Sequence, residues 1–139
     1  MEKFSILPIL KKIPILKNLN EEDESAIIKN ITLQYFPAGY EVFIQGKEGD
    51  SMYIIKRGSV NITRDHEKVA TLHENDFFGE MALFSNEPRN ASAVTETEGE
   101  LFALNKEDFC ALLLKDQHMA DHISAEFVKR LKQNNEKNH

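Results

Sequence analysis

The feature that most constrains the fold is a succession of short apolar runs between about residues 31 and 104, each followed by turn-forming residues. The runs are rich in valine, isoleucine, tyrosine and phenylalanine, which favour strands, and glycine, asparagine or aspartate comes after them. The clearest runs are Tyr40–Ile44, Met52–Ile55, Val60–Ile62 and Val69–Leu72. Many short strands at near-regular spacing predict a barrel, a sandwich or a roll.

Helices are predicted on both sides of this strand region. Asn20 and Asn105 are each followed within three residues by acidic side chains. This is the pattern of a capping side chain and then acids at the positive end of a helix dipole. The apolar segment 4–16 predicts an N-terminal helix or helical turn packed on the domain. A last helix is expected from near Gln117, because apolar residues recur at every fourth position: Met119, Ile123, Phe127 and Leu131.

Net charge limits the partners. The 139 residues, the size of one ordinary domain, include 17 basic and 23 acidic side chains, which give a net charge of −6. Proteins that bind nucleic acid usually carry a basic surface, so this chain alone is not expected to bind one, and any phosphate must be bound by a local group of residues. No apolar run reaches the roughly 18–20 residues of a membrane span. We therefore expect no membrane insertion and a cytoplasmic location.

One segment interrupts the strand pattern. Residues 77–84 do not have the pattern of a strand, because Gly79 is followed by the good helix formers Glu80–Leu83. The start of a helical turn exposes N–H groups that suit an anion. Arg89 follows nine positions after Glu80, and its planar fork of donors matches phosphate oxygens. These features favour a sugar-phosphate site, although a surface ion pair between Glu80 and Arg89 would give the same pattern.

The stretches Gly79–Leu83 and Pro88–Ser92 together resemble the phosphate-binding cassette of cyclic nucleotide-binding domains. Such domains occur in regulatory subunits of cAMP-dependent protein kinase, in cyclic nucleotide-gated channels and in the bacterial catabolite activator protein. The resemblance covers roughly Pro14 to Leu131. It implies one α+β domain over residues 1–139: an antiparallel, jelly-roll-like, eight-stranded β-roll flanked by helices. Within it we expect N-terminal helices in 1–30, the roll in 31–104 with the cassette at 78–92, and C-terminal helices in 105–134.

The resemblance also implies roles for individual residues. Glu80 would accept a hydrogen bond from the ribose 2′-hydroxyl, and Arg89 would pair with the exocyclic oxygens of the cyclic phosphate. The backbone N–H groups of Gly79 and Ala82 would support the ribose and phosphate, and Ser92 would lie close to the base. One arginine in a shielded pocket would then neutralise a singly charged ligand, despite the net charge of −6.

Two positions depart from the family pattern. Asn90 follows the arginine where the family often has serine, threonine or alanine, and its amide can still donate to phosphate. A threonine there is associated with a cGMP preference in some members, so its absence favours cAMP. Asn75 stands before Asp76 where glycine is usual, and asparagine tolerates the left-handed turn better than most residues.

The last helix of the family usually covers the purine. Phe127, Arg130 and Leu131 are the candidates here, with the Arg130 guanidinium stacked on the base; alternatively, Phe127 and Leu131 are core residues and Arg130 is solvated. We expect a sensor that transmits ligand occupancy through its C-terminal helices to an effector domain or protein partner elsewhere. A homodimer through the last helix is left open.

Two other functions also stay open. A degenerate roll that binds a protein is one, although the presence of both Glu80 and Arg89 argues against it. A cupin-like metal-dependent enzyme is the other, and it would need inward-facing histidines and a carboxylate, which His66 and His73 alone do not supply.

Enzymatic and metal-binding motifs are not evident. His118 and His122 have the i, i+4 spacing of some zinc ligands, but no third ligand cluster accompanies them in the sequence. Cys110, the only cysteine, lies among apolar helix residues and is expected in the core. We therefore expect no enzyme, no catalytic residue, no metal, and no cofactor other than cAMP or cGMP as ligand.

Overall fold

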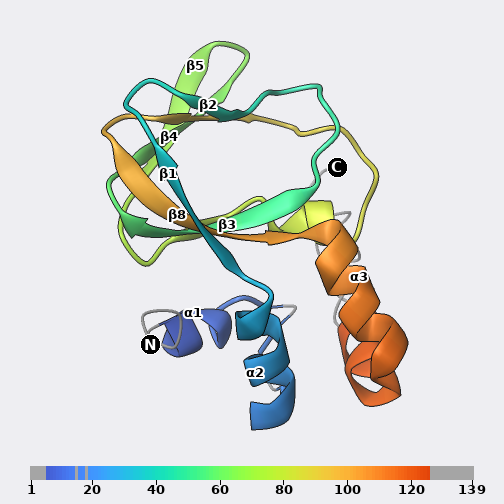
Figure 1. Cartoon of the computed structure of the whole chain (residues 1–139). Coiled ribbons are helices and arrows are strands. Elements are labelled where there is room, and N and C mark those ends of the chain that lie inside the picture. Colours follow the sequence, from blue (N-terminus) through green and yellow to red (C-terminus); the bar gives the residue numbers. More distant parts are fainter. Residues whose placement is uncertain (1–5, 15, 18, 126–139) are drawn as a thin grey trace.

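The computed structural model describes residues 6–14, 16–17 and 19–125. The strands are β1 (Thr32–Phe36), β2 (Glu41–Phe43), β3 (Ser51–Arg57), β4 (Val60–Arg64), β5 (Glu67–Leu72), β6 (Phe77–Phe78), β7 (Ser92–Thr95) and β8 (Gly99–Asn105). They form two antiparallel four-stranded sheets, in the orders β1-β8-β3-β6 and β2-β7-β4-β5. Figure 1 shows the two sheets facing each other, and the expected eight-stranded β-roll is confirmed.

The helical segments are α1 (Leu7–Leu10), α2 (Glu21–Lys29), the single 3₁₀ turn η2 (Glu80–Leu83) and α3 (Lys106–Lys115), and residues 117–125 are helical as well. Asn20 and Asn105 cap α2 and α3, each accepting a hydrogen bond from a backbone N–H three residues on, at 2.7 and 2.8 Å. Figure 1 shows α1, α2 and α3 gathered on one side of the roll. Within the described ranges, no helix has the length and apolar character needed to cross a membrane.

Strands β3 and β8 are buried on both faces, which explains why residues 52–55 form a continuous apolar run. Successive side chains of a strand point to opposite faces. Met52 and Ile54 therefore pack against the helices, while Tyr53 and Ile55 point into the roll. The helical core that covers the outer face of this sheet includes Ile9, Leu10, Ile27, Ile28, Phe109, Met119 and Ile123. The position of the helices is thus fixed by an apolar sheet face that they keep from water.

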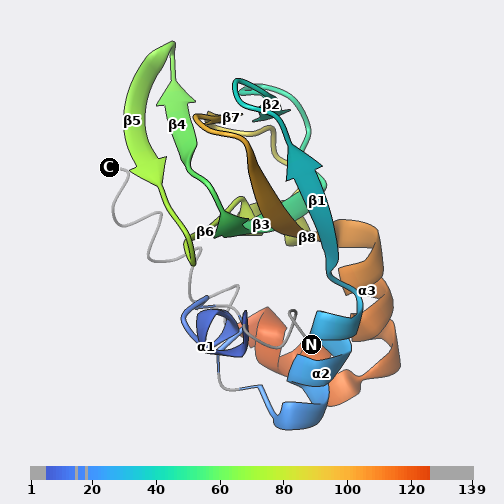
Figure 2. The same cartoon turned by 60° about the vertical axis from the view of Figure 1, so that its left-hand side comes forward.

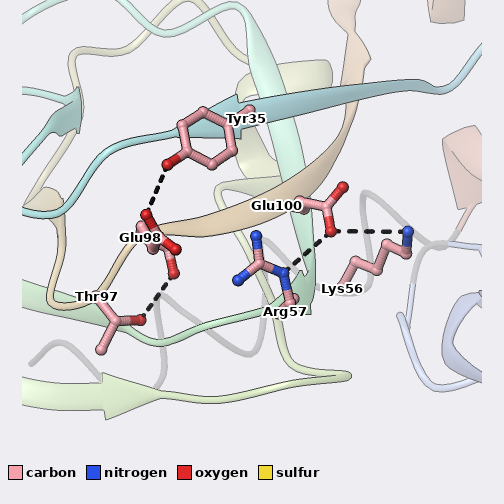
Figure 3. Close-up of polar contacts among 6 residues, drawn as sticks. All are labelled: Tyr35, Lys56, Arg57, Thr97, Glu98 and Glu100. Atoms are coloured by element: carbon pink, nitrogen blue, oxygen red, sulfur yellow. Dashed lines mark hydrogen bonds and ion pairs between the residues drawn. The ribbon is translucent and has the colours of Figure 1, made fainter.

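The surface at the ends of β1, β3 and β8 is polar (Figure 3). The Tyr35 hydroxyl donates to Glu98 at 2.8 Å, and Arg57 Nε donates to Glu100 at 3.1 Å. Lys56 Nζ lies 3.8 Å from the same Glu100 oxygen. Solvated ion pairs of this kind contribute about 1 kcal/mol or less. These charges pair with one another across the strands.

The expectation that residues 77–84 contain no strand is wrong for the first two of them. Phe77 and Phe78 form β6 and pair with Ile54 and Tyr53 of β3. The Phe78 ring stacks on the Tyr53 ring with 5.4 Å between centroids, inside the roll. Phenylalanine favours strands, but a strand of two residues also depends on pairing with its neighbour and on burial of its rings. The turn before it has Asn75 at φ 74°, the left-handed conformation expected of that asparagine.

Candidate functional site

Gly79 begins the segment that the sequence singled out. Its φ of 78° lies in the left-handed region, and it precedes the 3₁₀ turn η2 directly. Glycine suits this conformation, and a Cβ here would lie 2.8 Å from Arg89 Nη1, so a larger residue would also displace the end of that side chain. The Ala82 N–H donates to the Gly79 carbonyl at 3.2 Å, so it is engaged within the turn. Glu80, the first residue of η2, is half-buried.

Backbone carbonyls of β3 and of the residue before η2 hold the Arg89 side chain in place. Nη2 donates to the Ser51 carbonyl at 2.7 Å, and Nη1 donates to the Gly79 carbonyl at 3.2 Å. The guanidinium carbon lies 3.9 Å from the centre of the Phe43 ring, within the range of a cation–π contact. Nε is buried and has no hydrogen-bond partner among the described residues. The cation is therefore oriented by neutral carbonyls and by an aromatic ring, and its Nε nitrogen has no acceptor among the described residues.

The Arg89 backbone is tied to the loop between β2 and β3. Its N–H donates to the Lys47 carbonyl, and its carbonyl accepts from the Gly46 N–H, both at 2.8 Å. Pro88 and Glu48 form an isolated antiparallel β-bridge next to these hydrogen bonds. Gly49 then passes so close to the guanidinium that a Cβ there would lie 2.2 Å from Nε. The position of Arg89 thus depends on a loop that lies about forty residues earlier in the chain.

The electrostatic environment of Arg89 is mixed. Burial lowers the pKa of Arg89 from its usual value, while Tyr53, Asp50 and Glu80 act in the opposite direction. Burial also raises the pKa of Tyr53 above 10. Arg89 forms no ion pair with Glu80 within the described part of the chain, so the two are not the surface pair that the sequence left open. A guanidinium stays protonated at neutral pH, and no carboxylate of the described residues contacts this one.

A pocket of about 260 Å³ lies beside Arg89. It is close to the lower end of the range for small-ligand sites, about 300 Å³. Ten residues line it: Glu41, Val42, Phe43, Ile44, Lys47, Glu48, Gly49, Asp50, Tyr53 and Arg89. Of the residues expected at the site from the sequence, only Arg89 is among them. The pocket therefore adds the β2–β3 loop to the candidate site.

Sequence reasoning missed Phe43, Gly49 and Ser51 as parts of the site. Gly49 fits the family pattern of turns and Phe43 reads as a strand residue, so neither pointed to a ligand. Ser51 contributes only its backbone carbonyl, for which no side-chain signal exists. A glycine beside an aspartate in a charged loop is the one local hint of a close backbone approach.

The other residues that the sequence predicts at the site do not line this pocket. Asn90 is exposed, and its carbonyl accepts from Arg64 Nε at 3.3 Å. Ser92 is half-buried at the start of β7, and its hydroxyl oxygen accepts from the Gln45 N–H at 2.8 Å. The expected lid residues Phe127, Arg130 and Leu131 lie outside the described residues.

The requirements of a cupin-like centre are not met in the described part of the roll. His66 and His73 are both exposed. Among the described residues, a group of histidine and carboxylate side chains close enough to hold a metal lies between the helices and contains Asp23, Asp116 and His118.

Comparison with known proteins gives consistent results. The family profile described as "Cyclic nucleotide-binding domain" matches residues 33–116. A cAMP-dependent protein kinase regulatory subunit from Yarrowia lipolytica is 34% identical over 106 residues, which are 75% of this chain and 28% of that protein. A cGMP-dependent protein kinase from Caenorhabditis briggsae is 33% identical over 121 residues, 81% of this chain and 16% of that protein. The chain thus spans less than a third of the length of these two relatives.

A solved structure is similar over much of the chain. The regulatory domain of Toxoplasma gondii PKA, crystallised with cAMP, superposes with a TM-score of 0.71 at 27% sequence identity. The match covers 80% of this chain and 44% of that one.

Proposed function

Because this chain belongs to the cyclic nucleotide-binding domain family, we propose that it binds a cyclic nucleotide, cAMP in preference to cGMP, without turning it over. The family is regulatory. The observation that carries the proposal is the half-buried Arg89 guanidinium, whose hydrogen bonds to described residues go to neutral carbonyls, with Nε unpaired among them. Partial burial disfavours this cation, and a phosphate monoanion supplies both a contacting negative charge and an acceptor.

The cyclic phosphate would contact Arg89 on the side of the pocket. Its exocyclic oxygens can accept from the buried Nε if the Gly49 loop moves aside, or they can replace the Ser51 and Gly79 carbonyls at the Nη atoms. The second arrangement would release both carbonyls and so shift the start of η2. The Phe43 ring would keep the guanidinium oriented in either case.

The other expected ligand contacts follow from this placement. Glu80 would accept from the ribose hydroxyl. The Ser92 oxygen already accepts from the Gln45 N–H, so its own O–H is available to donate to the base. The Ala82 N–H is engaged with the Gly79 carbonyl, so it would contact the ligand only if η2 moves. Asn90 in place of threonine supports cAMP over cGMP.

Transmission to the C-terminal helices has a direct route in the described residues. Phe84, which follows η2, packs edge-on against Phe109 of α3 with 5.4 Å between ring centroids. Lys106 Nζ donates to the Ser85 carbonyl at 3.3 Å and also contacts Asn86 Oδ1. If the ligand displaces η2, we therefore expect α3 to shift as well, because these contacts join the two elements. Ligand drives this change only to the extent that it binds the displaced state more tightly.

The proposal also covers the last helix, which would close over the base, and the effector that would respond to it. Arg130 would stack on the base once the last helix closes. An effector domain or a protein partner would read the position of α3, and a homodimer stays a prediction. The cytoplasmic location also stays a prediction.

Isothermal titration calorimetry with cAMP, cGMP and linear AMP tests the proposal. We expect cAMP to bind most tightly and linear AMP least. Ligand at 100 times its Kd should raise the free energy of unfolding by about 2.7 kcal/mol. Absence of heat and of thermal stabilisation with both cyclic nucleotides would contradict the proposal.

Substitutions at Arg89 test the assignment of the phosphate contact. Arg89→Ala should weaken binding by at least about tenfold, since a hydrogen bond to a charged group contributes about 1.5–3 kcal/mol. Arg89→Lys keeps the charge but loses the planar fork, and it should bind with intermediate affinity. The matched control is Arg57→Ala, which removes a half-exposed arginine on the outer surface and should bind like the wild type. Equal affinities of Arg89→Ala and Arg57→Ala would show that Arg89 does not contact the phosphate.

A further inference from the structure

A second cluster of ionisable side chains lies outside the nucleotide site, where α2 meets the C-terminal helices. Asp23 comes from the first turn of α2, Asp116 from the junction after α3, and His118 from the first turn of the helix that follows. One ligand atom from each of the three lies within 4.8 Å of the other two. Figure 2 shows α2 beside these helices, and the shared apolar core of Ile27, Ile28, Met119 and Ile123 holds them together.

The Asp23 carboxylate is the unusual member of this cluster. The side chain is 2% exposed, and no described N–H or O–H donates to its buried Oδ2 atom. His118 Nδ1 lies 3.8 Å from Oδ2, which is too long for a hydrogen bond. An ionised carboxylate that is buried without a donor is strongly unfavourable, so this position requires a proton or a cation.

The neighbouring carboxyl increases this requirement. Burial raises the pKa of Asp23 to about 6, and the negative charge of Asp116 acts in the same direction. Two carboxyl groups that face each other repel when both are ionised, and a cation between them removes that repulsion as effectively as a shared proton.

We propose that Asp23, Asp116 and His118 form a binding site for a divalent cation of the zinc class. Two carboxylates and one imidazole suit Zn²⁺ better than Mg²⁺ or Ca²⁺, which prefer oxygen ligands alone. Bonds of about 2.0–2.2 Å to a tetrahedral ion place its ligand atoms about 3.4 Å apart. The ligand atoms, which lie within 4.8 Å of one another, must therefore approach by at most about 1.4 Å, and the His118 side chain, which is 72% exposed, has room to rotate.

Hydrogen bonds around the cluster show which atoms of Asp116 and His122 are available to a cation. Asp116 Oδ1 accepts from the Met119 N–H at 3.0 Å, which orients the carboxylate and leaves its other oxygen for the ion. His122 is not part of the site, because its Nε2 is hydrogen-bonded to the Lys17 carbonyl at 2.8 Å. A cation held here would tie α2 to the start of the last helix. The inference goes beyond nucleotide binding and does not depend on it.

Calorimetric titration of the chelator-treated full chain with ZnCl₂, in the absence of nucleotide, tests the site. We expect one equivalent to bind to the wild type, with affinity reduced at least about tenfold in His118→Ala and in Asp23→Asn. His118 is exposed, so its replacement keeps the test valid even if the Asp23 variant fails to fold. The controls are His73→Ala, an exposed histidine on the roll, and Asp121→Asn, an exposed acid on the same helix, and both should bind like the wild type.

Three results would overturn the inference. They are the lack of stoichiometric Zn²⁺ binding by the wild type, unchanged affinity in His118→Ala, and an equal loss of affinity in His73→Ala. The last result would mean that Zn²⁺ binds surface histidines without preference.

Discussion

Replacing Gly49 by alanine should displace the Arg89 guanidinium without removing its charge. The new Cβ would lie 2.2 Å from Nε, 2.5 Å from Cζ and 2.9 Å from Cδ of Arg89, whereas ordinary contacts begin at 3.4 Å. The Arg89 side chain must therefore move by about 1 Å or more, because the packing of an interior leaves no room for such an overlap. Gly49 itself has no left-handed φ, so alanine fits its backbone and the collision is the whole perturbation.

The magnitude follows from the contacts that Arg89 would lose. These are the hydrogen bonds to the Ser51 and Gly79 carbonyls, at 2.7 and 3.2 Å, and the contact with the Phe43 ring. Hydrogen bonds to charged groups contribute about 1.5–3 kcal/mol each, and a cation–π contact about 0.5–2 kcal/mol. The displaced guanidinium regains water, so we expect the free energy of unfolding to fall by about 1–3 kcal/mol. Cyclic nucleotide affinity should fall by about 10–100-fold.

A double-mutant cycle measured by urea denaturation and calorimetry separates this effect from general damage. Gly49→Ala should cost less than about 0.5 kcal/mol when Arg89 is already alanine, because the colliding side chain is gone. Gly39→Ala is the control: it meets nothing within 4 Å, but its φ of +77° should cost about 1–2 kcal/mol in strain without changing nucleotide affinity. The reasoning would be refuted if Gly49→Ala had the same effect in both backgrounds, or no effect at all.

Three further predictions concern the fold and can be checked by urea denaturation. Phe109→Ala should lower the free energy of unfolding by about 3–5 kcal/mol, because this 0%-exposed ring leaves a cavity in the helical core. Thr95→Val should lower it by about 1–3 kcal/mol, since the buried hydroxyl accepts from the Tyr40 N–H at 2.8 Å. Asn105→Ala should lower it by about 1 kcal/mol through loss of the α3 cap.

Each of these three predictions would be contradicted by a specific result. Leu114→Ala is the control for Phe109→Ala, because Leu114 is 90% exposed on the same helix and its loss should change stability by about 0.5 kcal/mol or less. Equal effects of the two would mean that α3 packs on its other face. A neutral Thr95→Val would indicate that water replaces the hydroxyl. If Asn105→Ala were as costly as Phe109→Ala, the asparagine would have a role beyond capping.

Local patterns predict much of the fold. The caps at Asn20 and Asn105, the strand runs and the helical turn after Gly79 are all encoded by neighbouring residues, because capping, turn and strand preferences act over a few positions. The β6 strand is too short to be predicted in this way, although phenylalanine favours strands. Phe77 and Phe78 become a strand because β3 lies beside them and the roll buries the Phe78 ring.

The sequence alone determined the chemistry that the chain can offer: an arginine nine positions after a Gly-Glu pair, in an acidic domain with many short strands. The surroundings of that arginine follow from the folded arrangement of the chain. Two backbone hydrogen bonds, from the Gly46 N–H to the Arg89 carbonyl and from the Arg89 N–H to the Lys47 carbonyl, join the β2–β3 loop to the segment that contains Arg89. Arg89 therefore contacts the backbone of Gly49, the ring of Phe43 and the carbonyl of Ser51.

The same distinction holds among the helices. Sequence spacing paired His118 with His122, whereas the packing of α2 placed His118 beside Asp23, which lies 95 positions earlier in the chain. The physical reason is that burial of apolar side chains fixes which elements pack together, and the partners of each polar group follow from that packing.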